Sequence, residues 1–126
     1  FERNMTSEEL ENRLIDFAVS CIKATKHSDQ SFASQHLCSQ LIRSATSVAL
    51  NYSEAIAAQS ARDYIHKMQI CLKELRESKT NLRIQKGANL LKQIEKLDKL
   101  IDESNQLILI FSKSISTSKK KNKLKN

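Results

Sequence analysis

At 126 residues the chain is long enough for one domain with one hydrophobic core, and we look for one core rather than two. Hydrophobic residues make up 40% and charged residues 28%, the balance of a globular rather than a disordered protein. The chain has no proline and one glycine, Gly87, which argues strongly against an all-β sandwich or barrel, because these need many turn residues. It shows no apolar run of about 18 residues and no basic-then-apolar leader, so we expect neither a membrane span nor a secretory signal.

The formal charge of +7 is distributed unevenly along the chain. Five of the 21 basic side chains lie in the last eight residues, and the rest of the chain is close to neutral. The end of the chain is also rich in serine and poor in large apolar residues, so we predict a disordered basic tail over 117–126. Such a tail either contacts phosphates, releasing counterions, or serves only solubility.

The three cysteines, Cys21, Cys38 and Cys71, are predicted to be free thiols. An odd number of cysteines at these spacings fits neither a disulfide framework nor a zinc site. Each lies beside an apolar stripe of a predicted helix, where a buried thiol behaves as a small hydrophobic group. Unpaired thiols favour a reducing compartment, so we expect a cytoplasmic protein.

The first two predicted helices cover 7–26 and 32–57. In the first, the apolar residues from Leu10 to Cys21 recur at steps of 4, 3 and 4, which places them on one face. In the second, apolar residues recur at steps of 3 or 4 throughout, and further apolar residues widen the apolar arc. This arc is wider than one neighbouring helix requires, so we expect the helix at 32–57 to make a contact outside the bundle.

The last two predicted helices cover 60–85 and 89–115. Ser60 with Asp63 forms a capping-box pattern at the beginning of the third helix, and Gly87 is expected to end it in a left-handed conformation. The apolar residues of the fourth helix alternate steps of 4 and 3, which is the seam of a heptad repeat.

Short connections between four helices make sequential helices antiparallel neighbours. We therefore predict an all-α fold, an antiparallel up-down-up-down four-helix bundle over 1–116, followed by the disordered basic tail over 117–126.

The sequence carries no pattern that predicts catalysis or a cofactor. A single glycine excludes a glycine-rich phosphate loop. Asp63 and His66 have the i,i+3 spacing of di-iron bundles, but those bundles need two such pairs and two further inward carboxylates. No serine or cysteine has a candidate base. We therefore predict no enzyme, no metal site and no cofactor.

Two polar constellations remain. Basic residues on the third helix recur at steps of 3 or 4 and either contact phosphates or form a solvated helix edge. Four polar residues on the second helix either hold a ligand or an RNA group, or form a hydrogen-bonded seam between helices or subunits. The basic strip consists of Lys73, Arg76, Lys79, Arg83 and Lys86, and the terminal candidates for nucleic-acid binding are Lys119, Lys120 and Lys121. The polar stripe consists of Arg43, Ser47, Asn51 and Glu54.

Two segments, 41–55 and 58–78, resemble segments of the 23S ribosomal RNA intervening-sequence proteins. The resemblance lies in the Arg, Ser, Asn and Glu of the polar stripe and in the run Leu72-Lys73-Glu74-Leu75-Arg76-Glu77. It implies an antiparallel four-helix bundle that assembles as a homopentamer, with no enzymatic activity. Thr80 and Asn81 stand where an aromatic pair is common in the family, so we expect no aromatic contact there.

These observations lead to two functional hypotheses. The first is a non-enzymatic, oligomeric protein that associates with RNA or another nucleic acid through a basic surface, without reading bases. The second is a structural or adaptor oligomer that binds a protein partner and has no nucleic-acid role. Steep salt dependence of binding is expected of the first hypothesis alone.

Overall fold

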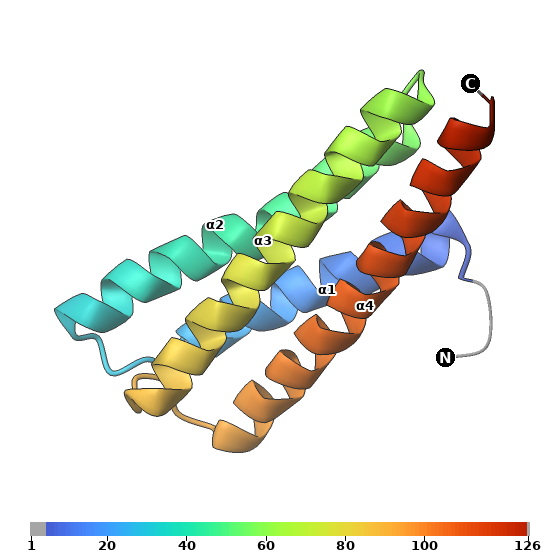
Figure 1. Cartoon of the computed structure of the whole chain (residues 1–126). Helices are drawn as coiled ribbons and strands as arrows, with labels where there is room; N and C mark the ends of the chain where they lie inside the picture. Colours follow the sequence, from blue (N-terminus) through green and yellow to red (C-terminus); the bar gives the residue numbers. More distant parts are fainter. Residues whose placement is uncertain (1–4, 126) are drawn as a thin grey trace.

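The computed structural model describes residues 5–125, and of Lys125 the backbone alone. It contains the helices α1 (Ser7–Thr25), α2 (Phe32–Ile56), α3 (Ala61–Gly87) and α4 (Ile94–Lys125), which are joined by short connections (Figure 1). Consecutive helices run antiparallel and pack together, and α1 also contacts α4. The predicted all-α four-helix bundle is therefore confirmed. Residues 1–4 and 126, which the predicted domain and tail include, lie outside the described residues.

The first three helices begin where their capping residues lie. The Glu9 N–H donates to Thr6 Oγ1 and the Thr6 N–H donates to Glu9 Oε1, both at 3.0 Å, which completes a capping box. The hydroxyls of Ser31 and Ser60 each accept, at 3.1 Å, from the backbone N–H three residues further on. Each cap satisfies a backbone donor that the helix itself leaves unpaired, so these beginnings follow from local sequence.

The connection between α3 and α4 differs from the prediction in two ways. Gly87 is the last residue of α3 and has no positive φ, and Asn89 takes the left-handed conformation instead, at a φ of 57°. In addition, α4 begins at Ile94 rather than near residue 89. The reason is tertiary, because two backbone hydrogen bonds of 3.0 and 3.1 Å tie this connection to the one between α1 and α2.

The end of α4 also differs from the prediction. The helix continues through Lys125, whereas the sequence predicts a helix to about residue 115 and a disordered tail after it. Among the residues whose side chains are described, none after Ile115 is buried, so the predicted boundary marks the end of the packed seam and not of the helix. No glycine or proline interrupts the segment, lysine is a good helix former, and cations are favoured at a helix C-terminus.

The core contains most of the apolar residues that the helical periods predict, but Ile94 of the predicted α4 seam is exposed, and Leu100 and Leu107, which lie outside that seam, are buried. Phe111 of α4 contacts Tyr52 of α2 edge to face, with 5.8 Å between the ring centroids. Burial of such large side chains from water stabilises the fold by roughly 1.5–3 kcal/mol each. Apart from these two rings, the buried side chains include Leu14, Phe17, Leu41, Val48, Met68, Leu75, Leu82, Leu97 and Leu107.

The three cysteines are free and buried, as predicted. Burial raises the pKa of the Cys21 and Cys71 thiols to about 12, and it also raises the pKa of Cys38. The thiols are therefore protonated at neutral pH and act as small hydrophobic groups.

A ladder of buried polar side chains joins α2 to α3. The hydroxyls of Ser44 and Ser78 lie 2.8 Å apart, Asn81 donates to the Leu37 carbonyl at 2.9 Å, and Gln85 donates to Asn81 Oδ1 at 2.7 Å. No buried side-chain nitrogen or oxygen in the described part of the chain lacks a partner. A fully satisfied polar network fixes the register of the two helices, because any slip leaves buried groups unpaired.

Candidate nucleic-acid interface

The basic strip lies on the outer side of α3, where Arg76 lines a hollow together with residues of α2, and Arg83 and Lys86 line another together with residues of α4. Four of its five residues are exposed, and Lys79 is half-buried. From Lys73 to Lys86 the strip spans 13 residues, which is about 20 Å at the helical rise of 1.5 Å per residue. The structure therefore brings the five predicted cations together on one surface, of which one end faces α4.

Aspartates of α4 compensate that end of the strip. Lys86 Nζ lies 2.6 Å from Asp98 Oδ1. Arg83 and Lys86 line a shallow hollow together with Asp98 and Asp102. The positive charge of the strip is therefore weakest where α3 ends and α4 begins.

The other end of the strip forms no ion pair, although the charge of Lys73 helps to lower the pKa of Glu77. Within residues 5–125, its first three cations form no ion pair with any carboxylate. The two glutamates beside them on α3, Glu74 and Glu77, bind Arg43 of α2 instead. The three cations without an ion pair are Lys73, Arg76 and Lys79.

The terminal lysines form a separate group. Lys119, Lys120 and Lys121 are exposed on the last turns of α4. The antiparallel register set by Lys86 and Asp98 places them level with the beginning of α3, about 12 Å along the axis from Lys73. The structure therefore does not merge them with the strip.

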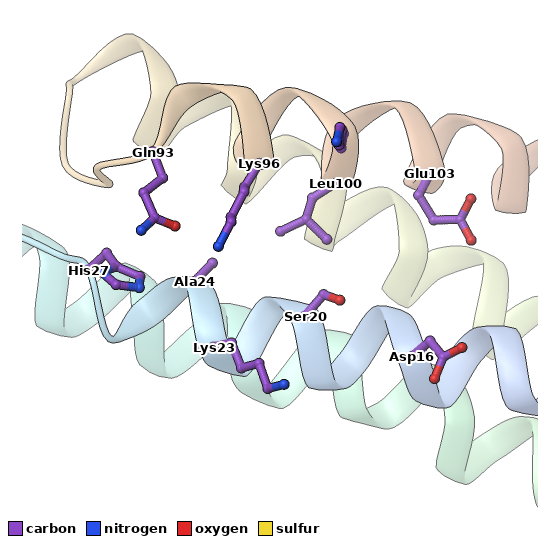
Figure 2. A pocket seen from close by; sticks show the side chains of 10 residues that line it. Asp16, Ser20, Lys23, Ala24, His27, Gln93, Lys96, Leu100 and Glu103 are labelled. Carbon is purple, nitrogen blue, oxygen red and sulfur yellow. The ribbon is translucent and has the colours of Figure 1, made fainter.

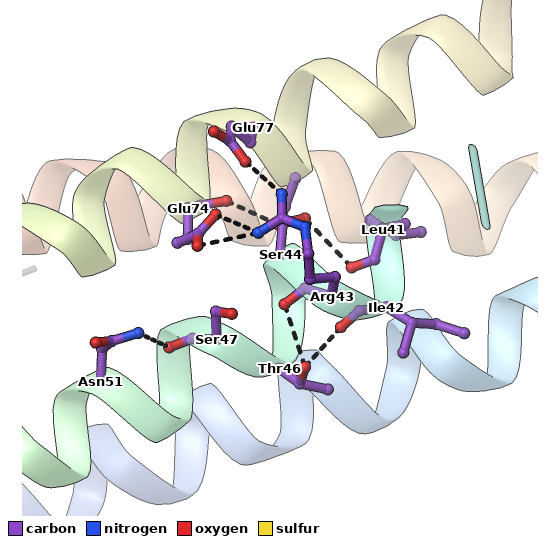
Figure 3. A network of polar contacts seen from close by, with 10 residues as sticks. Leu41, Ile42, Arg43, Ser44, Thr46, Ser47, Asn51, Glu74 and Glu77 are labelled. Carbon is purple, nitrogen blue, oxygen red and sulfur yellow. Dashed lines mark hydrogen bonds and ion pairs between the residues drawn. The ribbon is translucent and has the colours of Figure 1, made fainter. Parts of the chain in front are cut away.

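The polar stripe of α2 lies at the seam with α3, and its charged members find partners within the chain (Figure 3). Arg43 Nη1 donates to Glu74 Oε2 at 3.2 Å, and Nη2 donates to Glu77 Oε2 at 2.8 Å. Asn51 donates to the Ser47 carbonyl at 2.9 Å. Glu54 accepts from Lys67 Nζ at 2.7 Å. The stripe therefore has the contacts of an interhelical seam, one of the two interpretations that the sequence leaves open.

If the polar stripe is an interhelical seam, its charged residues Arg43 and Glu54 need partners, but the sequence alone does not identify them. The partners of Arg43 are Glu74 and Glu77, and the partner of Glu54 is Lys67. Lys67, Glu74 and Glu77 are separated by 7 and 3 residues, a helical spacing that places them on one side of α3. That spacing becomes specific only once the register of α2 against α3 is known.

The two glutamates that bind Arg43 have opposite electrostatic environments. Burial, followed by the hydrogen bond and negative charge of Glu77, raises the pKa of Glu74, whose side chain is 12% exposed. The hydrogen bond from Arg43 lowers the pKa of Glu77, which is 41% exposed. A raised carboxyl pKa means that the folded state favours the neutral acid, and a lowered one that it favours the carboxylate.

Opposite effects on stability follow from these pKa shifts. The contribution of Glu74 is present below its ordinary pKa and is lost as the pH rises through the raised pKa, whereas that of Glu77 is lost as the pH falls through the lowered pKa. At pH 7 we expect Glu74→Gln to raise the free energy of unfolding and Glu77→Gln to lower it by about 0.5 kcal/mol. Urea denaturation at pH 7 and pH 4 measures both, and the Glu74→Gln difference should vanish at pH 4. Equal losses for both variants at pH 7 would contradict this account.

The described residues hold no group of three or more His, Cys, Asp or Glu side chains placed to bind a metal ion. Asp63 and His66, the i,i+3 pair of the sequence, are both exposed on α3. None of the helices in residues 5–125 is both long and apolar enough to cross a membrane.

Comparison with known proteins places the bundle in a family. The 23S rRNA-intervening sequence protein family matches residues 8–113, from the first turn of α1 to well into α4. The chain belongs to this family. The basic strip and the polar stripe both lie within the matched residues.

A solved structure has the same fold. It is the crystal structure of a protein of unknown function from the S23 ribosomal protein family of Bacteroides thetaiotaomicron. The two sequences are 25% identical, the similarity covers 84% of this chain and 97% of the other, and the TM-score is 0.74. Among curated proteins none matches this chain.

Proposed function

We propose that this small helical protein is non-enzymatic and associates with RNA through the basic strip of α3. The observation that carries the proposal is that Lys73, Arg76 and Lys79 form no ion pair within residues 5–125, because Arg43 binds the neighbouring glutamates. Cations without carboxylate partners are free to neutralise phosphates and release counterions, without reading bases. The chain belongs to a family that is named after 23S rRNA intervening sequences, which supports RNA as the nucleic acid.

The test is the salt dependence of RNA binding. We expect the four-residue variant Lys73→Gln, Arg76→Gln, Lys79→Gln and Arg83→Gln to reduce the slope of log K against log salt concentration by about 3, because each phosphate on a single strand contributes about 0.7. Fluorescence anisotropy with a labelled single-stranded RNA over a salt series measures the slope.

The matched control replaces four lysines of α4, Lys119, Lys120, Lys121 and Lys123, by glutamine and removes the same charge. If this variant loses binding while the α3 variant keeps it, the terminal lysines are a nonspecific tether and the proposal for α3 is wrong. A flat salt response of the unchanged protein contradicts RNA association altogether and leaves the adaptor function, with a protein partner, as the better hypothesis.

We also propose that the chain self-associates, through an apolar stripe on α1. Ile15, Val19 and Ile22 recur at steps of 4 and 3 and are 45%, 41% and 37% exposed. The polar stripe of α2 is paired within the chain, so this stripe of α1 is the better candidate for a subunit contact. The family resemblance suggests a second copy as the occupant, and a pentamer as the assembly.

Light scattering tests the self-association. We expect the unchanged protein to scatter as an oligomer and Ile15→Asp with Val19→Asp to scatter as a single chain, because two charges in an apolar contact oppose burial. The control is Leu109→Asp on α4, where the leucine is 71% exposed and lies outside the stripe. A single chain for the unchanged protein, or an unaltered oligomer for the α1 variant, contradicts the proposed contact.

A further inference from the structure

The contact between α1 and α4 is the least extensive of the four helix pairs, and Arg13 forms a polar link across it. Arg13 Nε donates to Glu103 Oε2 at 2.7 Å, and Arg13 Nη2 donates to Glu103 Oε1 at 2.7 Å and to Gln106 Oε1 at 2.8 Å. This fork is half-buried on both sides. From the fork to the end of α1, the two helices leave an open cleft between them.

The cleft has a volume of about 410 Å³ and is lined only by α1, α4 and their flanking residues (Figure 2). Figure 2 shows Lys96 reaching from α4 across the gap toward Ala24 of α1, with the ring of His27 near its tip. Leu100 and Ala24 supply an apolar wall, and Ser20 adds a hydroxyl. The volume lies within the range of about 300–1,000 Å³ that is usual for small-molecule sites.

The charges of the lining make the cleft positive. Glu103 is neutralised by Arg13, which leaves one carboxylate, Asp16, against three lysines. In Figure 2 the side chain of Lys23 points away from α4, so the positive charge nearest the cleft comes from α4. None of the three lysines forms an ion pair within residues 5–125. The partially negative C-terminus of α1 and the partially positive N-terminus of α4 meet here, and their dipoles offset each other. The side chains therefore determine the sign of the charge in the cleft. The lysines are Lys23, Lys96 and Lys99.

We propose that this cleft binds a phosphomonoester joined to a flat apolar ring, as in a nucleoside monophosphate or at the phosphorylated end of an RNA strand. Ammonium groups are point charges that suit a phosphate, and the wall of Ala24 and Leu100 suits the face of a base. His27 and Ser20 add hydrogen-bonding groups beside the lysines. The cleft lies between α1 and α4, away from the basic strip of α3, so the inference does not rest on the proposed function.

The test is a titration with adenosine 5′-monophosphate, followed by backbone amide shifts in NMR spectra of the full chain. We expect saturable shifts at the ends of α1 and α4, and a loss of affinity of about tenfold in Lys96→Gln with Lys99→Gln. The matched control, Arg62→Gln with Lys113→Gln, removes the same charge from exposed positions outside the cleft and outside the basic strip, and should bind adenosine 5′-monophosphate like the unchanged protein. Adenosine, which lacks the phosphate, should give no saturable shift.

Two short RNA strands of one sequence, with a 5′-phosphate and a 5′-hydroxyl, identify the source of the phosphomonoester. At high salt, stronger binding of the phosphorylated strand than of both the 5′-hydroxyl strand and the mononucleotide indicates the end of an RNA. Stronger binding of the mononucleotide than of either strand indicates a free nucleotide. Either result supports the cleft, provided that the Lys96 and Lys99 variant weakens it. The absence of saturable shifts with every phosphorylated probe overturns the inference, as does an equal loss of affinity for adenosine 5′-monophosphate in the Arg62 and Lys113 control.

Discussion

Replacement of Phe111 by alanine should lower the free energy of unfolding by about 3–5 kcal/mol, a large part of the 5–15 kcal/mol typical of a whole domain. The Phe111 side chain has no exposed surface and contacts the ring of Tyr52 edge to face. It lies in the last part of the heptad seam, within the core cluster to which all four helices contribute. Truncation removes the buried ring and leaves a cavity that rigid helices cannot collapse to fill. Urea denaturation followed by circular dichroism at 222 nm measures the loss.

The control for this prediction lies two residues earlier on the same helix. Leu109 is 71% exposed, so Leu109→Ala removes apolar surface that the fold does not bury, and we expect a change within about 0.5 kcal/mol. Similar losses for both variants would mean that the face of Leu109 is covered, for example in an oligomer. A small loss for Phe111→Ala would instead mean that the core around Tyr52 is loosely packed.

These two residues also show why the fold could be predicted from sequence. Phe111 stands at a heptad position and Leu109 does not, and the period alone assigns one to the core and the other to the surface. The capping pairs at Thr6 and Ser60 are equally local, since each involves residues three apart. Where neighbours along the helix determine the structure, the sequence is sufficient.

The errors arise where distant residues determine the structure. Residues 89–93 have the pattern of the first turn of a helix, but hydrogen bonds to the α1–α2 connection, some 60 residues earlier, hold them in a non-helical connection. The candidate site follows the same rule. The sequence places five cations on one edge of α3, but it does not reveal that Arg43 occupies both neighbouring glutamates, or that Asp98 pairs with Lys86. The distribution of free charge therefore emerges only with the packing of the helices.

The largest expected effect outside the apolar core is at Gln85 of the polar ladder. Its side chain is fully buried, donates to Asn81 at 2.7 Å and accepts from the Cys38 thiol at 3.7 Å. Gln85→Ala leaves a cavity and strands the Asn81 oxygen without a donor, so we expect a loss of about 2–4 kcal/mol in the free energy of unfolding. The control is Ile84→Ala, because that neighbour is 50% exposed and should change stability by less than about 1 kcal/mol.

A second variant separates the two causes of that loss. Gln85→Met keeps nearly the same volume but removes the amide, so only the stranded Asn81 oxygen remains, at a cost of about 1–3 kcal/mol. If Gln85→Met is as stable as the unchanged protein, the ladder contributes only packing, and the register of α2 and α3 rests on the apolar core. If it loses stability and unfolds less cooperatively in urea, hydrogen bonding between α2 and α3 fixes that register. The same register sets the position of Arg43 against Glu74 and Glu77, and with it the free charge of the α3 strip.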